Sequence, residues 1–367
     1  MVEVGKKKSL ISECIFTLRL LLACFALLIL IFGLTVSLSW SAWLLLGGQF
    51  LFAVSIIAPW SGPRRTARSL AGVAGVLMLA GSFIVVARQG VVNPRPGEVY
   101  SLGSESPLPF GELIEERDIV FLATRILPFM GGLTFKESAG LLPSIVALYS
   151  SMDSQRGSFS SPLTHSLIGF PYVGNSPVLS FDPVQSHSSN RAIVFLHGVG
   201  GNWSLMCWLV AEAAESIGAS THCPSLGILG TWGANRGRAI LSELLDSLKS
   251  QGKSEVYLVA MSAGAVGAGQ LARDFEKQLH GVALLNGSHP AIRDVDLPLF
   301  LLWSSDDERF PANLLAWIAK GAAERNPHVT RAEVAGGHLF PVKQKDEFLK
   351  LLKSWLRSVA DEEPHET

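Results

Sequence analysis

The stretch Glu255-Val-Tyr-Leu-Val-Ala-Met-Ser-Ala-Gly264 decides the fold of this 367-residue chain. Its first part, Glu255–Ala260, contains the apolar run Val256–Ala260, which predicts a buried strand. The small residues of Ala263–Ala272 predict a helix directly after it. A sharp turn between the two would force Ser262 into a strained backbone conformation and push its hydroxyl out at the carboxyl end of the strand.

Such a turn tolerates only small residues two positions before and two positions after the serine, and Ala260 and Gly264 meet this demand. The common pattern has glycine at both places, so Ala260 is a mild departure from it. The same pentapeptide also fits an ordinary helix start with Ser262 as its N-cap. Ser262 is therefore a nucleophile only if the chain also supplies a base.

A serine hydroxyl is a poor nucleophile until an imidazole takes its proton and a carboxylate orients that imidazole. Gly336-Gly337-His338 follows a predicted strand at Val329–Val334, and Asp306-Asp307 follows another at Leu299–Trp303. The order serine, acid, histidine on successive strand ends is that of a known hydrolase arrangement. Ser262 and His338 are the predicted nucleophile and base.

A third predicted strand, Arg191–Leu196, runs into His197-Gly198-Val199-Gly200-Gly201-Asn202. Glycines let the backbone approach a substrate, and backbone N–H groups can stabilise a developing oxyanion. We expect the donors to be the amide of Val199, or that of Gly200, together with the amide of Ala263.

These motifs resemble the α/β-hydrolase family over roughly Leu163–Leu356, with His197-Gly198 at its oxyanion loop and Ser262 at its nucleophile elbow. The resemblance implies a mostly parallel sheet covered by helices on both faces. It also implies that His197 is structural. The family pattern aspartate-x-x-apolar-proline falls on Asp307–Pro311, which favours Asp307 as the acid. Asp306 stays an alternative, and further candidates lie one loop earlier: Asp294 and Asp296.

The alternation of strand and helix patterns agrees with that architecture. Two earlier runs, 164–170 and 177–181, predict an antiparallel edge hairpin. Only residues 286–297 lie between the strand after the serine helix and the strand of the acid, which is too little for a lid domain.

The N-terminal quarter contains three runs without a charged residue: Leu20–Leu38, Ala42–Ala58 and Leu70–Ala87. Each is about long enough to cross a bilayer core, so we expect three transmembrane helices at about residues 17–38, 42–59 and 70–87 before the hydrolase fold. Buried helices of a soluble domain are the alternative. Basic residues flank these runs as the positive-inside rule requires for a cytoplasmic N-terminus: Lys6, Lys7, Lys8, Arg64, Arg65 and Arg68.

This orientation places the hydrolase domain in the periplasm or outside the cell. A net charge of −1 gives no reason to expect a nucleic-acid partner. Cys207 and Cys223 could form a bridge in an oxidising compartment, or remain two unrelated buried thiols. His222 beside Cys223 lacks a second ligand pair, so no metal is expected.

The expected divisions are a membrane region at 1–89, a linker with helices at 90–160, the hydrolase domain at 161–360 and a polar tail at 361–367. Helices over Glu112–Phe129 and Lys136–Met152 would form a cap, a membrane-proximal collar or a plain spacer.

The predicted protein is thus a membrane-anchored serine hydrolase without a cofactor, with the bilayer and a small ester or acyl compound as its partners. Carboxylic esters, including acyl-lipid or other apolar esters, are the expected substrates. The same triad would also serve an acyltransferase, a thioesterase or a peptidase. A catalytically inactive interaction module is a further alternative.

Overall fold

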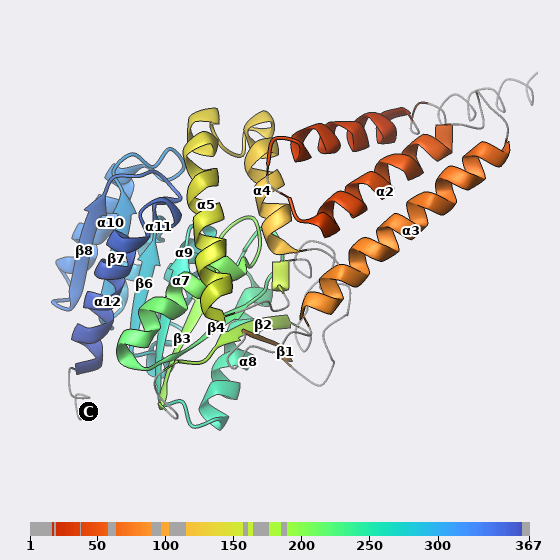
Figure 1. Cartoon of the computed structure of the whole chain (residues 1–367). Coiled ribbons are helices and arrows are strands. Elements are labelled where there is room, and N and C mark those ends of the chain that lie inside the picture. The colour runs from red at the N-terminus through yellow and green to blue at the C-terminus, as the bar shows by residue number, and fades with distance from the viewer. Residues whose placement is uncertain are drawn as a thin grey trace, which may run out of the picture. The chain divides into compact units, whose positions relative to one another are not determined.

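The computed structural model describes residues 17, 20–36, 38–57, 64–89, 97–102, 115–156, 161–163, 176–184 and 189–361. The chain divides into two compact units (Figure 1). The first comprises Met1–Gly90 and Glu112–Ser138, and the second comprises Val91–Gly111 and Ala139–Thr367. Of the described residues, 115–138 thus group with the N-terminal helices, and 97–102 group with the sheet.

The second unit is built on an eight-stranded sheet of order β1-β2-β4-β3-β5-β6-β7-β8. The strands are β1 Glu98–Leu102, β2 Ser176–Phe181, β3 Arg191–Leu196, β4 Ser220–Pro224, β5 Glu255–Met261, β6 Gly281–Leu285, β7 Leu299–Ser304 and β8 Val329–Val334. Strands β3 to β8 run parallel, whereas β2 is antiparallel to both of its neighbours, β1 and β4. The predicted mostly parallel sheet is confirmed.

The edge of the sheet differs from the predicted hairpin. Strand β2 covers the second predicted run, but its outer partner is β1, with Val99 opposite Leu179. The first predicted run, 164–170, lies outside the described residues. The sequence predicts a linker here, within residues 90–160, but β1 forms at Glu98–Leu102 because pairing with β2 satisfies its backbone groups.

Helices cover both faces of the sheet (Figure 1). The helices that follow β3 along the chain, between and after the strands, are α7 Ser204–Ala214, η4 Glu215–Ile217, α8 Asn235–Ser250, α9 Ala263–Leu271, η5 Glu276–Gln278, η6 Pro290–Asp294, α10 Ala312–Ala323, α11 Phe340–Lys343 and α12 Lys345–Asp361. Successive strand residues point to opposite faces. Val194 and Leu258 therefore join the core under α8, α9 and α10. On the other face, Phe300 stacks on Trp355 of α12 with ring centroids 5.8 Å apart.

Helix α8 packs against the sheet through leucines at helical spacing. Leu241, Leu244 and Leu248 are all fully buried in the core under the sheet. Burying leucine side chains of this kind stabilises the fold by roughly 1.5–3 kcal/mol each.

The first unit contains a helix over residues 20–33, α2 Trp40–Ile57, α3 Arg64–Gln89, α4 Glu116–Ile126, η3 Leu127–Met130 and the start of α5 Phe135–Arg156. Helices α2 and α3 pack closely at two glycines. A Cβ atom at Gly48 would lie 2.7 Å from Met78 Cγ, and one at Gly81 would lie 2.8 Å from the Ser41 carbonyl oxygen. Helix α3 begins at Arg64, so the flanking basic residues Arg64, Arg65 and Arg68 belong to the first turns of this helix.

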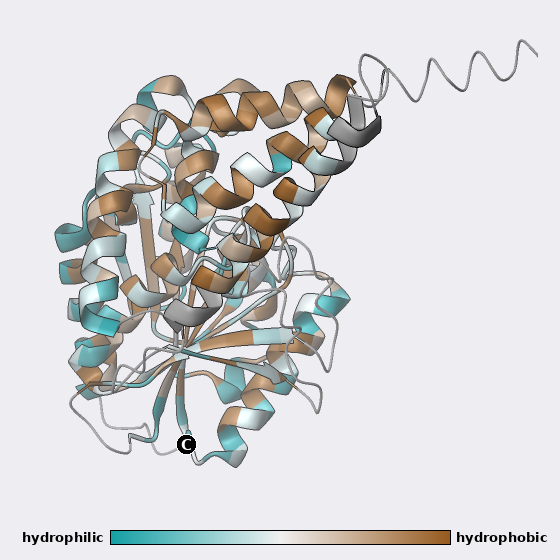
Figure 2. Ribbon diagram, turned by 45° about the vertical axis from the view of Figure 1, so that its right-hand side comes forward, coloured by the Kyte–Doolittle hydropathy of each residue, from teal (hydrophilic) through white to brown (hydrophobic). Residues whose placement is uncertain are grey.

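The predicted apolar runs coincide with these helices, and brown segments mark them in Figure 2. Within the described part of the chain, however, no helix combines the length and the apolar character needed to cross a membrane. The three predicted spans are therefore not confirmed. The predicted helices of residues 112–152 are present as α4, η3 and α5, and a role as cap or collar stays a prediction.

Candidate active site

Ser262 occupies a strained turn between the end of β5 and the start of α9. Its backbone has φ 57° and ψ −123°. Among the described residues, Ser262 and Asn286 are the non-glycine residues with positive φ, and such a conformation is uncommon for a side chain other than glycine. The strain points the serine side chain away from the sheet, as the sequence pattern predicts.

The steric demand of this turn falls mainly on Gly264. A Cβ atom at Gly264 would lie 2.2 Å from the Leu196 carbonyl oxygen of the neighbouring strand, so no larger residue fits. Ala260 is fully buried with its methyl group in the core. The departure from glycine at position 260 is therefore accommodated, whereas glycine at position 264 is required.

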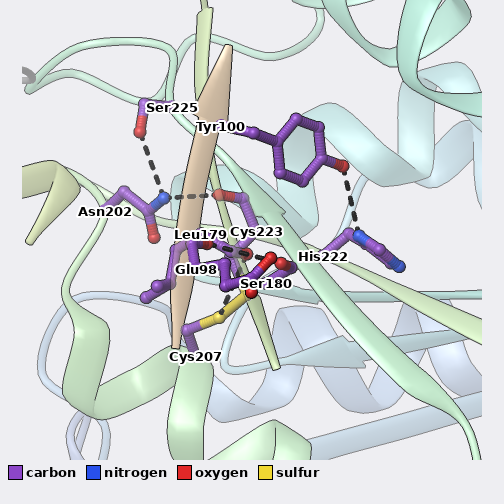
Figure 3. Close-up of a disulfide and its surroundings, with 9 residues drawn as sticks. All are labelled: Glu98, Tyr100, Leu179, Ser180, Asn202, Cys207, His222, Cys223 and Ser225. Carbon is purple, nitrogen blue, oxygen red and sulfur yellow. Dashed lines mark hydrogen bonds between the residues drawn. A yellow bond between two sulfur atoms is a disulfide. The ribbon is translucent and has the colours of Figure 1, made fainter. Parts of the chain in front are cut away.

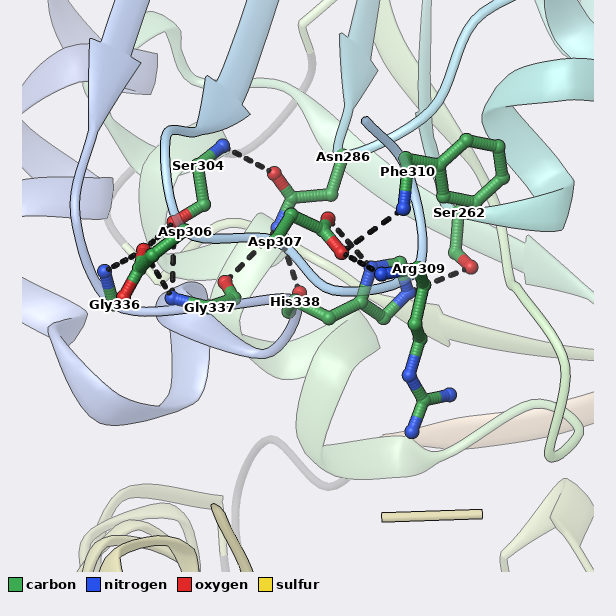
Figure 4. A network of polar contacts seen from close by, with 10 residues as sticks. All are labelled: Ser262, Asn286, Ser304, Asp306, Asp307, Arg309, Phe310, Gly336, Gly337 and His338. Atoms are coloured by element: carbon green, nitrogen blue, oxygen red, sulfur yellow. Dashed lines mark hydrogen bonds and ion pairs between the residues drawn. The ribbon is translucent and has the colours of Figure 1, made fainter. Parts of the chain in front are cut away.

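The structure brings Ser262, His338 and Asp307 together, as Figure 4 shows. His338 Nε2 lies 2.8 Å from Ser262 Oγ, and His338 Nδ1 lies 2.8 Å from Asp307 Oδ2. The side chains of His338 and Asp307 are 4% and 0% exposed. The three groups come from the carboxyl ends of β5, β8 and β7, where parallel strands meet at one edge of the sheet.

The strand order, the strained serine turn and this chain order of serine, acid and histidine agree on one architecture. The chain has the α/β-hydrolase fold.

No protein-family model matches this α/β-hydrolase-fold chain, and no curated protein matches it. Among solved structures, a predicted CIB-like hydrolase from Thermoplasma acidophilum is 20% identical, covering 51% of this chain and 95% of its own, with a TM-score of 0.41. The Pyrococcus furiosus esterase Pf2001 is 14% identical to this chain. The match covers 52% of this chain and 90% of the esterase, with a TM-score of 0.44. XC6422 from Xanthomonas campestris, described as an α/β serine hydrolase without a lid, is 16% identical to this chain. The match covers 52% of this chain and 93% of XC6422, with a TM-score of 0.43.

Asp307 is held as a charged acceptor for the imidazole. Its Oδ1 accepts hydrogen bonds from the amides of Arg309 (2.8 Å) and Phe310 (3.1 Å). Burial would raise the pKa of Asp307, but the hydrogen bond and charge of His338 and these two amides together hold that pKa below its ordinary value. The Phe310 ring also stacks on the imidazole, with centroids 5.9 Å apart and an interplanar angle of 16°.

Asp306, the alternative acid, binds the backbone of the histidine loop. Its Oδ1 accepts from Ser304 Oγ (2.7 Å) and from the amides of Gly336 (2.7 Å) and Gly337 (2.9 Å). The Ser304 hydroxyl bond, followed by the Gly337 amide, lowers the pKa of Asp306 to about 2. Asp306 thus fastens the loop that carries His338. The earlier candidate Asp294 pairs with Arg325 on the surface.

Asn286 is a site residue that the sequence motifs did not indicate. It is fully buried, and its Nδ2 donates to the His338 carbonyl oxygen at 2.6 Å while its Oδ1 accepts from the Ser304 amide at 2.8 Å. Its side chain therefore links the ends of β6 and β7 to the histidine loop (Figure 4). A lone asparagine after a strand reads from sequence as an ordinary turn residue.

The loop after β3 approaches the serine closely. A Cβ atom at Gly198 would lie 2.8 Å from Ser262 Cβ, so only glycine fits there. Gly200 has φ 108°, and its amide donates to the Ile228 carbonyl oxygen at 2.7 Å. That amide is therefore unavailable to a substrate oxygen in this conformation.

Val199 and Ala263 are the predicted donors that remain. In the described structure the Val199 amide has no hydrogen-bond acceptor. Ala263 is the first residue of α9, where an N–H group has no acceptor within its helix. The Trp203 indole Nε1 donates to the Gly200 carbonyl oxygen at 3.1 Å, so the loop is fixed on both sides of the Gly200 peptide.

His197 has a structural position, as the family resemblance implies. Its Nδ1 lies 2.8 Å from the Gly198 carbonyl oxygen, and its Nε2 accepts from the Leu226 amide at 3.1 Å. These partners assign the proton to Nδ1. Burial lowers the pKa of His197 to about 4, so the ring is neutral and ties two loops together.

A disulfide bridge joins Cys207 of α7 to Cys223 of β4 (Figure 3). The end of the loop after β3 is fastened at the same place, because Asn202 Nδ2 donates to the Cys223 carbonyl oxygen at 2.6 Å. His222 next to it lies 3.2 Å from the Tyr100 hydroxyl through Nδ1 and 3.0 Å from Ser220 Oγ through Nε2. Both ring nitrogens of His222 therefore have protein partners.

Proposed function

We propose that this protein is a serine hydrolase that cleaves carboxylic esters through an acyl-enzyme. Ser262 is the nucleophile, His338 the general base and acid, and Asp307 the group that orients the imidazole. The observation that carries the proposal is the continuous contact from Ser262 Oγ through His338 to Asp307, with both hydrogen bonds at 2.8 Å.

In the first half of the proposed reaction, Ser262 Oγ attacks the ester carbonyl carbon while its proton passes to His338 Nε2. The carbonyl oxygen becomes an oxyanion, for which the amides of Val199 and Ala263 are the proposed donors. The bond to the alcohol then breaks, and His338 gives its proton to the departing oxygen. Water repeats the sequence on the acyl-serine and releases the carboxylic acid.

The electrostatics of Asp307 support its role in these steps. Because its pKa lies below the ordinary value, the carboxylate is charged near neutral pH and accepts the Nδ1 proton of the imidazole. This leaves Nε2 as the acceptor for the serine proton. The same negative charge stabilises the imidazolium that forms during each step.

Fluorophosphonate labelling of the full-length protein tests the proposal. We expect covalent labelling of wild type and none of Ser262→Ala, with ester hydrolysis falling by at least about a thousand-fold in that variant. Ser305→Ala is the matched control, because Ser305 is an exposed serine of the neighbouring β7–α10 segment. Labelling or turnover that persists in Ser262→Ala would exclude the proposed nucleophile.

We further propose that the N-terminal unit attaches the enzyme to a lipid bilayer, with the N-terminus in the cytoplasm and the hydrolase domain on the other side. Charge-free runs and flanking basic residues support this, as do exposed apolar side chains along α3: Val76 (66%), Leu79 (73%) and Phe83 (73%). The Cys207–Cys223 bridge fits an oxidising compartment.

Alkaline carbonate extraction of membranes from cells making the full chain tests the attachment. We expect the protein to stay in the membrane pellet. Protease added to intact cells or spheroplasts should reach the hydrolase domain, and recovery of the protein in the carbonate supernatant would contradict the proposal.

A further inference from the structure

We infer that two uncharged loops beside Ser262 form a subsite for an apolar acyl chain, so that the preferred substrates are esters of medium- or long-chain fatty acids; this inference rests on the proposed hydrolase function. The loops are residues 198–203, after β3, and residues 225–234, after β4. We call their shared surface the acyl wall.

The acyl wall is a single fixed surface because hydrogen bonds and close backbone packing join the two loops. The Gly200 amide donates to the Ile228 carbonyl oxygen at 2.7 Å, and the Trp232 indole donates to the His197 carbonyl oxygen at 3.0 Å. A Cβ atom at Gly230 would lie 2.8 Å from the Gly198 carbonyl oxygen, so the loops touch without side chains between them.

Three large apolar side chains project from these joined loops into solvent. Val199 is 61% exposed, Ile228 is 46% exposed and Leu229 is 62% exposed. A single exposed apolar side chain needs no explanation. Here, however, the three come from segments that meet directly beside the serine, since Gly198 packs against Ser262 Cβ.

The charges around the site are distributed unevenly. No Lys, Arg, Asp or Glu occurs from residue 192 to 211 or from residue 216 to 235, which covers both loops completely. The acid loop differs, because Asp306, Glu308 and Arg309 are exposed there. An ester with an apolar acyl chain and a polar alcohol matches this division, with its acyl chain along the acyl wall.

Chain-length preference measures this subsite. We expect kcat/KM of the full-length protein to rise from p-nitrophenyl acetate to p-nitrophenyl octanoate by up to roughly four-fold for each methylene group that the wall covers. In Leu229→Ser and Ile228→Ser, octanoate turnover should fall by about ten-fold and acetate turnover should change by less than about two-fold.

Val184→Ser is the matched control, because Val184 is an apolar residue as exposed as Ile228 (46%) and lies three residues after β2, where its amide donates to Glu215. It should leave both substrates unchanged. The inference is overturned if the two wall variants keep the wild-type ratio of octanoate to acetate turnover, or if Val184→Ser changes that ratio equally. Thermal unfolding of each variant identifies any that fails to fold, and the other wall variant then decides.

Alkyl fluorophosphonates of short and long chain separate this inference from the proposed function. Faster labelling of Ser262 by the long-chain probe in wild type, but not in Leu229→Ser, supports the acyl wall. Equal labelling by both probes overturns the acyl wall and leaves the serine hydrolase standing. Absence of labelling by either probe overturns both.

Discussion

In the part of the chain that the structure describes, Ser262 and Asn286 are the non-glycine residues with positive φ, and each directly follows one of two neighbouring parallel strands. Each such conformation costs on the order of 1–3 kcal/mol and persists only where the surroundings fix it. The Ser262 amide donates to the Leu285 carbonyl oxygen at 2.9 Å, and Asn286 donates to the His338 carbonyl oxygen at 2.6 Å. The strained backbone therefore fixes the proposed nucleophile and the proposed base on one shared frame.

Replacing Asp307 and Asp306 one at a time distinguishes a residue that orients the imidazole from a residue that supports the histidine loop. Asp307→Asn removes the acceptor for His338 Nδ1 and should lower kcat by roughly 10⁴-fold. Asp306→Asn weakens the clamp on Gly336 and Gly337 and should lower kcat by about ten-fold. Steady-state kinetics and intact fluorophosphonate labelling of Asp306→Asn check this prediction. A larger loss in Asp306→Asn than in Asp307→Asn would reverse the assignment of the acid.

The Trp203 indole is expected to act as a positioning group for the oxyanion loop. Trp203→Phe keeps a ring but loses the donor to the Gly200 carbonyl oxygen, so the Val199 amide should lose its alignment. We expect kcat to fall by about ten-fold with KM nearly unchanged, and the affinity for a trifluoromethyl ketone transition-state analogue to fall in parallel.

Trp317→Phe is the control for this prediction, since Trp317 is a half-exposed tryptophan on α10. An equal loss of substrate and analogue affinity in Trp203→Phe would indicate a general structural effect.

At the scale of single residues, the sequence predicts the site residues that directly follow the end of a predicted strand. Ser262, Asp307 and His338 each follow a predicted strand, and the structure brings their side chains into contact. The choice between the amides of Val199 and Gly200 could not be predicted, because it depends on the orientation of one peptide plane and on the Ile228 carbonyl oxygen. Asn286 carries no local signal, since its partners lie far away in the chain.

At the scale of helices and strands, periodicity predicts most elements of the sheet domain. Strands β3 and β8 have the predicted bounds, Arg191–Leu196 and Val329–Val334. Strand β1 is the exception. Its five residues, Glu98–Leu102, include a glutamate and a serine and follow a proline-rich stretch, so only its pairing with β2 makes it a strand.

The bridge between α7 and β4 should stabilise the sheet domain. Its two cysteines are separated by 16 residues, and closing a loop of that length contributes about 3 kcal/mol to the free energy of unfolding. Replacement of Cys207 and Cys223 together by serine should therefore lower the unfolding free energy by about that amount in urea titrations. Cys24→Ser is the control, because Cys24 is free and exposed. Equal stability of the double variant and wild type would contradict the prediction.

For the whole molecule, buried neutral histidines predict loss of stability in mild acid. Burial lowers the pKa of His197 to about 4, and burial with the nearby charge of Lys253 lowers that of His222 to about 3. In the unfolded chain both titrate near 6.5. Their contribution is complete above about pH 6.5, and it is lost as the pH falls, because only the unfolded chain takes up the protons.

Two such histidines give a slope of roughly 2.7 kcal/mol per pH unit between about pH 6 and pH 4. Urea unfolding at a series of pH values measures this slope. His222→Gln should reduce the slope by about half, and an unchanged slope would show that His222 titrates alike in both states. Partial burial of His280 also lowers its pKa and acts in the same direction.

The pairing of β1 with β2 sets a practical limit on shortening the chain. A fragment cut at residue 160 would keep every group of the site but would expose the outer backbone of β2, where Val99 now faces Leu179. An unpaired strand edge of this kind promotes aggregation through pairing with other copies of the chain. The hydrogen bond between the Tyr100 hydroxyl and His222 would also be lost. A minimal active fragment would therefore have to retain Glu98–Leu102. Without these residues, the exposed edge of β2 would have to be redesigned or cross-linked.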